Sequence, residues 1–226
     1  IERLAKKGIV GNIYKGKISR VLPGMQAAFV DIGLDKAAFL HASDIVTGKE
    51  SDGDSVQKVP DITELAKQGQ FLTVQVIKDP ISTKGARLTT DITLPSRYLV
   101  FMPGSKHVGV SQRIENPQDR NRLKAVVGQY THEHGSYIIR TAAEGIGERE
   151  LAQDAAFLKR LWAKIIERRQ RSKSPTMLYE DLSLSLRLLR DFVGTDLERI
   201  RVDSKLTYEL LIEFTQEFVP ELHDKL

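Results

Sequence analysis

Cysteine is absent from the 226 residues, so the sequence provides neither a disulfide framework nor a thiolate metal site. A chain without cysteine suits a reducing compartment, and we expect a cytoplasmic protein. No apolar run approaches the roughly 18 residues that a membrane-spanning helix needs, and no signal-peptide pattern opens the chain. The composition therefore excludes a disulfide-stabilised scaffold and gives no sign of a membrane protein.

Several catalytic motifs are also missing. The sequence has no G-x-x-x-x-G-K-S/T phosphate loop and no G-x-S-x-G motif. Acids that could hold a catalytic metal occur without a partner, at Asp31, Asp35, Asp44 and Asp79. His132 and His134 could reach one metal from a strand, although an exposed linker fits the same residues. No catalytic set can be assembled from these side chains.

The formal net charge is only +4, but the charges are unevenly distributed. Residues 159–173 contain seven Lys or Arg and one Glu, whereas residues 174–226 contain eleven acids and six bases. A basic helix on an otherwise balanced protein suits a polyanionic partner. A solvated helix face fits the same pattern, and so does docking on a protein or an anionic membrane, although we expect no membrane partner.

Three strands are predicted within residues 9–40. Apolar and polar residues alternate there in three runs, which the turn signals Pro23-Gly24 and Gly33-Leu34-Asp35 separate. The elements expected next are a polar surface loop (41–60), a short helix (61–69) and two further strands (71–78 and 87–94). Five strands with a helix before the fourth is the order of an OB-fold barrel.

Phe29 and Phe39 are the candidate binding residues of this barrel. If the aliphatic faces of the second and third strands form the core, both rings point outward on neighbouring strands. The strand beside them carries three cations, Lys15, Lys17 and Arg20. Lys84 falls in the loop between strands four and five, which flanks the ligand face of an OB fold. Aromatic rings among cations suit unpaired bases, although two rings that fill the far side of a small barrel fit the same periodicity.

A second module is predicted from about residue 91. Its expected elements are strands over 97–102, 107–114 and 136–139, a helix that begins at Asn116-Pro117, and a helix over about 148–171. Arg140 and Thr141 follow the last strand and precede the last helix. A strand, a loop of small residues and a helix in this order can bind an anion, because the loop N–H groups and the helix N-terminus favour negative charge. The Arg guanidinium adds a bidentate pair of donors, and the Thr side chain adds a hydroxyl. An Arg in a surface ion pair and a Thr that caps a turn fit as well.

The last segment predicts a helix over 182–192, a short strand over 200–203 and a helix over 205–218. It resembles part of a third unit.

Three long strings resemble a known family: GNIYKGKISRVLPGMQAAFVDIGLDKAAFLH, KGARLTTDITLPSRYLVFMPGSKHVGVSQRI and IIRTAAEG. They are similar to the ribonuclease E/G family, and to its ribonuclease G branch more than to its ribonuclease E branch. The resemblance extends over essentially the whole chain. It implies the N-terminal piece of a single-strand-specific endoribonuclease that acts in rRNA maturation and mRNA decay.

This resemblance implies an α+β fold in which an S1-type OB barrel is inserted into a subdomain similar to ribonuclease H. The implied divisions are a ribonuclease-H-like fragment (1–8), the S1-type RNA-binding domain (9–90), an α/β sensor of the 5′-monophosphate (91–185), and a second ribonuclease-H-like fragment (186–226). The motif match implies that Phe29, Phe39 and Lys84 contact single-stranded RNA.

The same motif match implies that the 5′-phosphate lies on Arg140 and Thr141, with Val100 packed near the terminal nucleotide. The family often has Gly where this chain has Ser96, and Tyr is known where it has Ile32. These two departures concern fine contacts and leave the Arg-Thr pair intact.

The resemblance further implies that catalysis needs Mg²⁺, held by two aspartates of a domain that would follow Leu226, and that the Cys pair of a zinc link would follow too. This piece is then expected to bind and sense RNA without cutting it, and the full-length protein to form a homo-oligomer. A non-enzymatic RNA-binding adaptor with an OB fold is the alternative.

Overall fold

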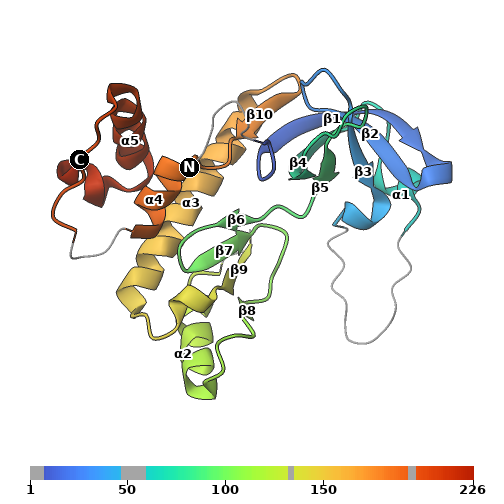
Figure 1. The fold of residues 1–226 in the computed structure, drawn as a ribbon. Coiled ribbons are helices and arrows are strands. Elements are labelled where there is room, and N and C mark those ends of the chain that lie inside the picture. The colour runs from blue at the N-terminus through green and yellow to red at the C-terminus, as the bar shows by residue number, and fades with distance from the viewer. Residues whose placement is uncertain (1–7, 47–59, 132–134, 193–196) are drawn as a thin grey trace. The chain divides into compact units, whose positions relative to one another are not determined.

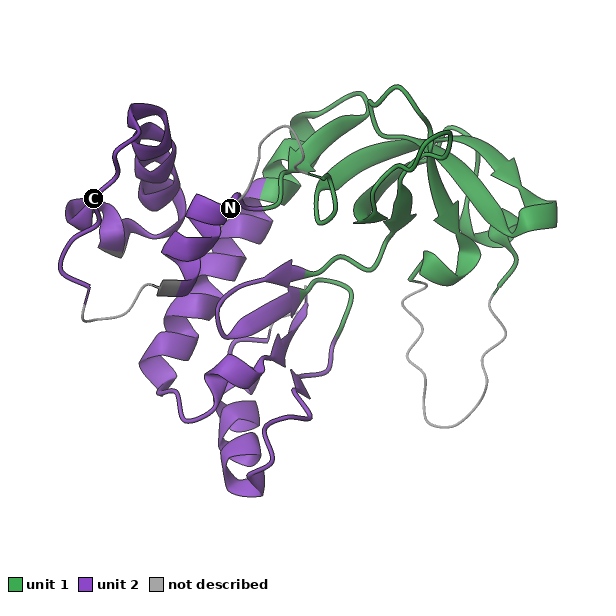
Figure 2. Ribbon diagram, in the orientation of Figure 1, with its two compact units in different colours: residues 1–93, 102–105, 165–181 green, residues 94–101, 106–164, 182–226 purple. Residues whose placement is uncertain are grey.

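The computed structural model describes residues 8–46, 60–131, 135–192 and 197–226 (Figure 1). The expectations for residues 1–7, for most of the 41–60 loop and for His132 and His134 lie outside these residues. The chain divides into two compact units, one of residues 1–93, 102–105 and 165–181, the other of residues 94–101, 106–164 and 182–226 (Figure 2).

A six-stranded sheet forms the first unit. Its strands are β1 (Ile13–Leu22), β2 (Ala27–Asp31), β3 (Ala38–His41), β4 (Phe71–Lys78), β5 (Arg87–Thr89) and β10 (Thr176–Tyr179), in the order β10-β1-β2-β3-β5-β4. Since β1 pairs with both β2 and β4, strands β1 to β5 close into a barrel. This is the barrel that the sequence predicts.

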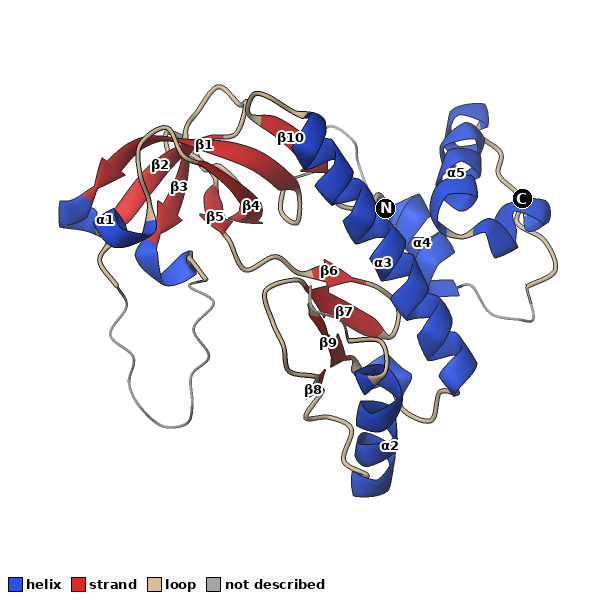
Figure 3. Cartoon of the chain, turned by 180° about the vertical axis from the view of Figure 1, so that it is seen from behind, coloured by secondary structure: helices blue, strands red, loops and turns tan. Residues whose placement is uncertain are grey.

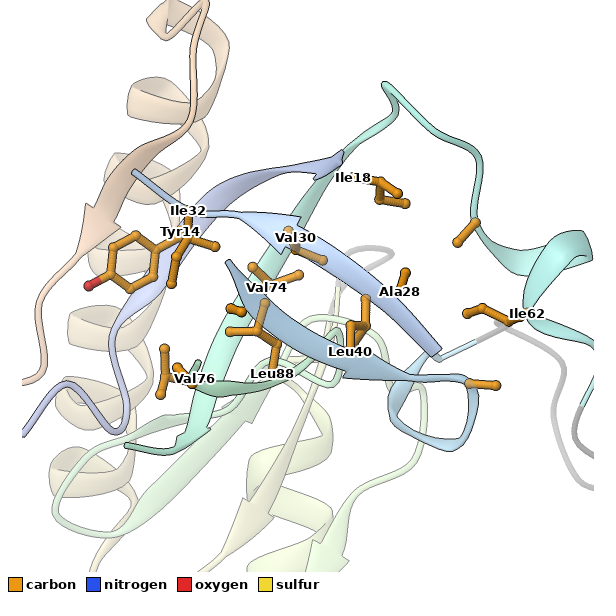
Figure 4. Packing of buried hydrophobic residues seen from close by; sticks show 14 residues of the cluster. Tyr14, Ile18, Ala28, Val30, Ile32, Leu40, Ile62, Val74, Val76 and Leu88 are labelled. Atoms are coloured by element: carbon orange, nitrogen blue, oxygen red, sulfur yellow. The ribbon is translucent and has the colours of Figure 1, made fainter. Parts of the chain in front are cut away.

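Alternation along the strands fills the barrel. Ala28 and Val30 of β2, Leu40 of β3, Val74 of β4 and Leu88 of β5 are fully buried in one cluster, where Figure 4 shows them. Each aliphatic side chain buried in this way contributes about 1.5–3 kcal/mol. The alternate side chains of β2 and β3 therefore lie on the outside of the barrel.

Short helices connect the barrel strands. They are η2 (Pro23–Met25), η3 (Ala42–Asp44) and α1 (Ile62–Leu65). The expected N-cap is confirmed, because the Asp61 carboxylate accepts from Thr63 N at 2.9 Å. Helix α1 is shorter than predicted, since Ala66 is already extended.

The prediction of one strand over 87–94 is wrong. β5 ends at Thr89, and Leu94–Pro95 forms a separate strand, β6, in the second sheet. Between them, Thr90 N donates to Asp44 O at 2.9 Å and Thr93 N donates to the side chain of Gln75 at 2.9 Å. The backbone is therefore held by partners outside a regular strand ladder.

Strand β10 has no counterpart in the sequence prediction. It pairs antiparallel with β1 at Ile13–Lys15 (Figure 3). Just beyond this strand, the backbone N of Asp181 donates a hydrogen bond of 2.8 Å to Asn12 Oδ1, which holds the chain there. Four residues without clear alternation carry too little periodic signal to be recognised.

The second unit contains a sheet in the order β6-β7-β9-β8. Its further strands are β7 (Leu99–Met102), β8 (Gly109–Val110) and β9 (Ser136–Ile139). Its helices include α2 (Pro117–Gly128), η4 (Thr141–Ala143) and the first part of α3 (Glu148–Arg171), which from Ile165 onward belongs to the first unit. The Asn116 cap of α2 is confirmed, because its side chain accepts from Gln118 N at 2.9 Å. The span of α3 agrees with the prediction, and Trp162 packs on Phe101 of β7 with 6.0 Å between ring centroids.

Two further helices, α4 (Leu184–Phe192) and α5 (Lys205–Phe218), and the turn η5 (Pro220–Lys225) end the described chain. Rings of Phe157, Phe214 and Phe218 form a cluster between α3 and α5. The strand expected over 200–203 is wrong. Ile200 donates one backbone bond to Lys225 O at 2.7 Å, but this segment forms no strand in the described structure.

Replacing Gly85 should destabilise the barrel. A Cβ at this position would lie 1.9 Å from Ala37 O, a backbone atom that cannot move without β3. We expect Gly85→Ala to lower the free energy of unfolding by about 1–3 kcal/mol in urea titrations. Gly24→Ala is the matched control, because nothing lies within 4 Å of its Cβ. Equal stability of the two variants would contradict this prediction.

Candidate nucleic-acid interface

Phe29 and Phe39 lie opposite one another on β2 and β3. Their ring centroids are 6.4 Å apart and their planes meet at 68°, an edge-to-face pair. Both side chains are half-buried, and neither belongs to the core cluster. The outward orientation predicted from alternation is confirmed, and the two rings do not fill the barrel.

Cations flank this aromatic pair on the same face. Arg20 of β1 lies opposite Phe29, and Arg87 of β5 lies beside Phe39. Partners across a sheet project to the same side. Arg87 forms an ion pair of 2.9 Å with Asp44, while His41 lies 6.5 Å from the Phe39 ring. The sequence prediction missed Arg87 and His41, although both follow from the strand register.

A third ring, Phe71 of β4, also lies among cations. The ammonium groups of Lys15 and Lys17 are 5.1 and 5.8 Å from its centroid, within the range of a cation–π contact. Lys15 is further fixed by donating to Arg169 O and Ser172 O at 3.2 and 2.5 Å. Lys17 is exposed and thus remains accessible to an anion.

Lys84 lies exposed in the loop between β4 and β5, as predicted. A bridge between Ile81 and Lys84, with backbone bonds of 2.8 and 3.1 Å, narrows this loop. Directly after it, Ala86 O accepts from Phe39 N at 2.7 Å. The loop that carries Lys84 is therefore joined to the strand that carries Phe39.

Arg140 and Thr141 follow β9 in the second unit. Arg140 Nη1 donates to the carbonyl oxygens of Ser96 and Arg97, and Arg140 N donates to Tyr98 O at 2.8 Å. Within the described residues Arg140 forms no ion pair, and its Nε and Nη2 atoms have no hydrogen-bond partner. In this part of the chain, the partners of Arg140 are therefore backbone carbonyls and not an acid, and its role as a phosphate-binding residue stays a prediction.

Thr141 and Val100 complete the predicted phosphate site. The Thr141 hydroxyl lies 2.9 Å from that of Ser111, which follows β8. Val100 lies on β7 between the buried residues Leu99 and Phe101 and is itself half-buried. Since β7 and β9 are neighbours in the sheet, the structure brings the three predicted residues to one sheet.

A buried carboxylate, Asp154 of α3, lies beside this site. It accepts from Ser96 Oγ at 2.5 Å and from the backbone N of Tyr98 and of Leu99 at 2.9 Å each. Burial raises the pKa of Asp154 above its ordinary value, while these hydrogen bonds act to lower the pKa. The sequence analysis missed Asp154, although an acid on the apolar face of α3, near Leu151 and Leu158, indicates a buried carboxylate.

Four of the seven cations in residues 159–173 have partners within the protein. Arg160 donates to Phe218 O, Arg168 donates to Leu178 O at 3.1 Å, and Lys164 and Arg171 form ion pairs of 2.9 Å. Local partners explain much of the basic composition without an external polyanion.

Across the described ranges, no group of three or more His, Asp or Glu side chains could hold a metal ion. In the same part of the chain, no helix is long and apolar enough to cross a membrane.

Two family models match the chain. Residues 7–89 match the S1 RNA binding domain, and residues 93–226 match the Ribonuclease E/G family. The second model covers more than half of the chain, so the chain belongs to the ribonuclease E/G family.

The individual relatives agree with this result. The chain is 66% identical to ribonuclease G of Escherichia coli strain K12 over 229 residues, which cover 100% of this chain and 47% of that protein. Ribonuclease G of Haemophilus influenzae is 61% identical with the same coverage. Ribonuclease E of a Nostoc species is 37% identical over 92% of this chain and 30% of that protein. The resemblance predicted from the sequence is confirmed, and the chain spans about half the length of its ribonuclease G relatives.

The role of the basic helix can be tested with Arg168. Its guanidinium is bonded to the backbone of β10, so Arg168→Met should lower the free energy of unfolding by about 1 kcal/mol in urea titrations. RNA affinity at constant salt should change less than twofold. Arg169→Met is the matched control, because among the described residues the Arg169 side chain forms no hydrogen bond or ion pair, although both positions are exposed. A large loss of RNA affinity in Arg168→Met, with stability unchanged, would favour a polyanion site on this helix.

Proposed function

We propose that this chain is the RNA-binding and 5′-end-sensing part of a single-strand-specific endoribonuclease that acts in rRNA maturation and mRNA decay in the cytoplasm. The observation that carries the proposal is the half-buried Phe29–Phe39 pair among cations on the outer face of an S1 domain. The parent protein is proposed to assemble as a homo-oligomer, as the family resemblance implies.

Single-stranded RNA would bind this face through its bases and its phosphates. Unpaired bases expose their flat faces and can stack on Phe29 and Phe39, whereas bases in a duplex are already stacked. Lys84 and Arg20 supply positive charge on either side of the two rings. Stacking accepts every base, so this face would hold RNA without reading its sequence.

The 5′-monophosphate would bind at Arg140 and Thr141. Nη1 of Arg140 is occupied by backbone carbonyls, which leaves Nε and Nη2 as donors for phosphate oxygens. The Thr141 hydroxyl adds a hydrogen-bonding group, and Val100 would pack near the terminal nucleotide. A triphosphate is bulkier and more highly charged, so this site would favour a monophosphate.

Cleavage is assigned to the part of the parent protein that its relatives have and this chain lacks. The family resemblance implies two aspartates that hold Mg²⁺, and the described residues offer no group of acids of that kind. The residues proposed here bind and orient RNA. A full-length protein that binds RNA but never cuts it would replace this proposal with the non-enzymatic adaptor.

Removing an aromatic ring should weaken RNA binding without unfolding the barrel. We expect Phe29→Ala and Phe39→Ala to reduce the affinity for a short unstructured RNA by about 5- to 100-fold, the range of one lost stacking contact. Fluorescence anisotropy at fixed salt measures the change. Met25→Ala is the control, since this apolar side chain is 59% exposed in the turn between β1 and β2. Unchanged affinity in both Phe variants would refute the stacking role.

The end sensor is tested with two RNAs that differ only in the 5′ phosphate. Arg140→Ala should abolish the preference for the 5′-monophosphate over the 5′-hydroxyl and leave internal binding largely intact. Arg199→Ala, at an exposed position elsewhere, should keep the preference. If the unmutated chain binds both ends equally, the sensor proposal fails.

A further inference from the structure

The turn between β6 and β7 is held from two sides. Ser96 N donates to Leu99 O at 2.7 Å and closes the turn on itself. One side of the turn faces the carboxylate of Asp154, and the other faces Arg140. Two oppositely charged groups thus share one short stretch of backbone.

Three consecutive peptide groups of this turn connect Asp154 to Arg140, two of them to its guanidinium and one to its backbone N–H. The peptide between Arg97 and Tyr98 donates its N–H to Asp154, while its carbonyl accepts from Arg140 Nη1. The peptide between Tyr98 and Leu99 donates its N–H to Asp154, and its carbonyl accepts from Arg140 N. The peptide between Ser96 and Arg97 follows the same pattern, since Ser96 O accepts from Arg140 and Arg97 N bonds to Asp154.

We propose that Asp154 is a positioning residue that fixes Arg140 for a terminal phosphate, holding its guanidinium through two of these peptide groups and its backbone through the third. The inference rests on the proposed 5′-end sensor and adds the residue that sets its geometry. Asp154 touches no substrate and acts only through the turn.

The physical reason lies in the direction of the peptide dipoles. A carboxylate at the N–H end and a guanidinium at the C=O end favour the same orientation of the Ser96–Arg97 and Arg97–Tyr98 peptides, and charge-assisted hydrogen bonds are stronger than neutral ones. A buried carboxylate is costly unless it is well bonded. Asp154 is only 9% exposed, so its bonds to the turn must persist for the fold to tolerate it.

Ser96 provides the control that distinguishes the positioning role of Asp154 from a purely structural role. Its hydroxyl donates to Asp154, and the residue is fully buried. Ser96→Ala removes the hydrogen bond from the Ser96 hydroxyl and leaves in place the three hydrogen bonds that the peptide N–H groups donate to Asp154.

The test compares variants of this chain on the same two RNAs, one with a 5′-monophosphate and one with a 5′-hydroxyl. Asp154→Asn should reduce the ratio of the two affinities by roughly tenfold, because the neutral amide has only one acceptor oxygen and loses the charge that strengthens the bonds to the peptide N–H groups. Ser96→Ala should change the ratio less than about twofold. The double variant Asp154→Asn/Arg140→Ala should have the ratio of Arg140→Ala alone, since Asp154 acts through Arg140.

A second measurement does not depend on RNA. In NMR spectra of the arginine side chains, Asp154→Asn should speed the exchange of the Arg140 guanidinium protons, while Ser96→Ala should not. An unchanged Arg140 signal in a folded Asp154→Asn variant would overturn the proposal. An unchanged ratio of the two affinities in the Asp154→Asn variant would overturn it as well.

The outcomes separate the two proposals. If the unmutated chain shows no end preference, the sensor has failed, and the Arg140 signal still decides whether Asp154 positions this side chain. Asp154→Glu keeps the charge but displaces the oxygens by one methylene. It replaces Asp154→Asn in both measurements if circular dichroism shows that the amide variant does not fold.

Discussion

The pairing of β1 with both β2 and β4 is the constraint on which the first unit depends. Closure gives every strand of the barrel an inside and an outside. The inside is apolar, so Phe29, Phe39 and Phe71 are left on outer faces. A bulge between Ile18 and Arg20 keeps Ile18 in the core while Arg20 stays beside Phe29. The aromatic and cationic face is thus a direct result of how the barrel closes.

The second unit depends on a different kind of interaction, in which backbone groups connect charged side chains. Its β6–β7 turn is short, and its peptide groups bond to Asp154 and Arg140 on opposite sides. Because backbone groups hold the charged side chains in place, such a site needs few side chains of its own. This explains how the proposed phosphate site can consist of little more than Arg140 and Thr141.

Much of the barrel could be predicted from the sequence, because alternation and turn residues are local signals. Phe29 and Phe39 were found for this reason, and Lys84 because it lies in a loop between two clear strands. Arg87 depends on a register between strands, and Asp154 depends on contacts with residues far away in the chain. Strand β10 and the break at Thr90 also depend on distant partners. Alternation therefore predicted the aromatic face of the barrel. The contacts that hold Arg140 in the second unit could be identified only from the three-dimensional structure.

The place of β10 in the chain has a consequence for folding during synthesis. Strands β1 to β5 are complete once Thr89 has been made, but β10 follows only after α2, β9 and α3. Until then, the segment of β1 at Ile13–Lys15 lacks one of its two neighbours. Unpaired strand edges invite association with other chains. The interval between the two events is thus the period in which the nascent barrel most needs protection, and Lys15, a charged residue on that open edge, is suited to discourage wrong pairing.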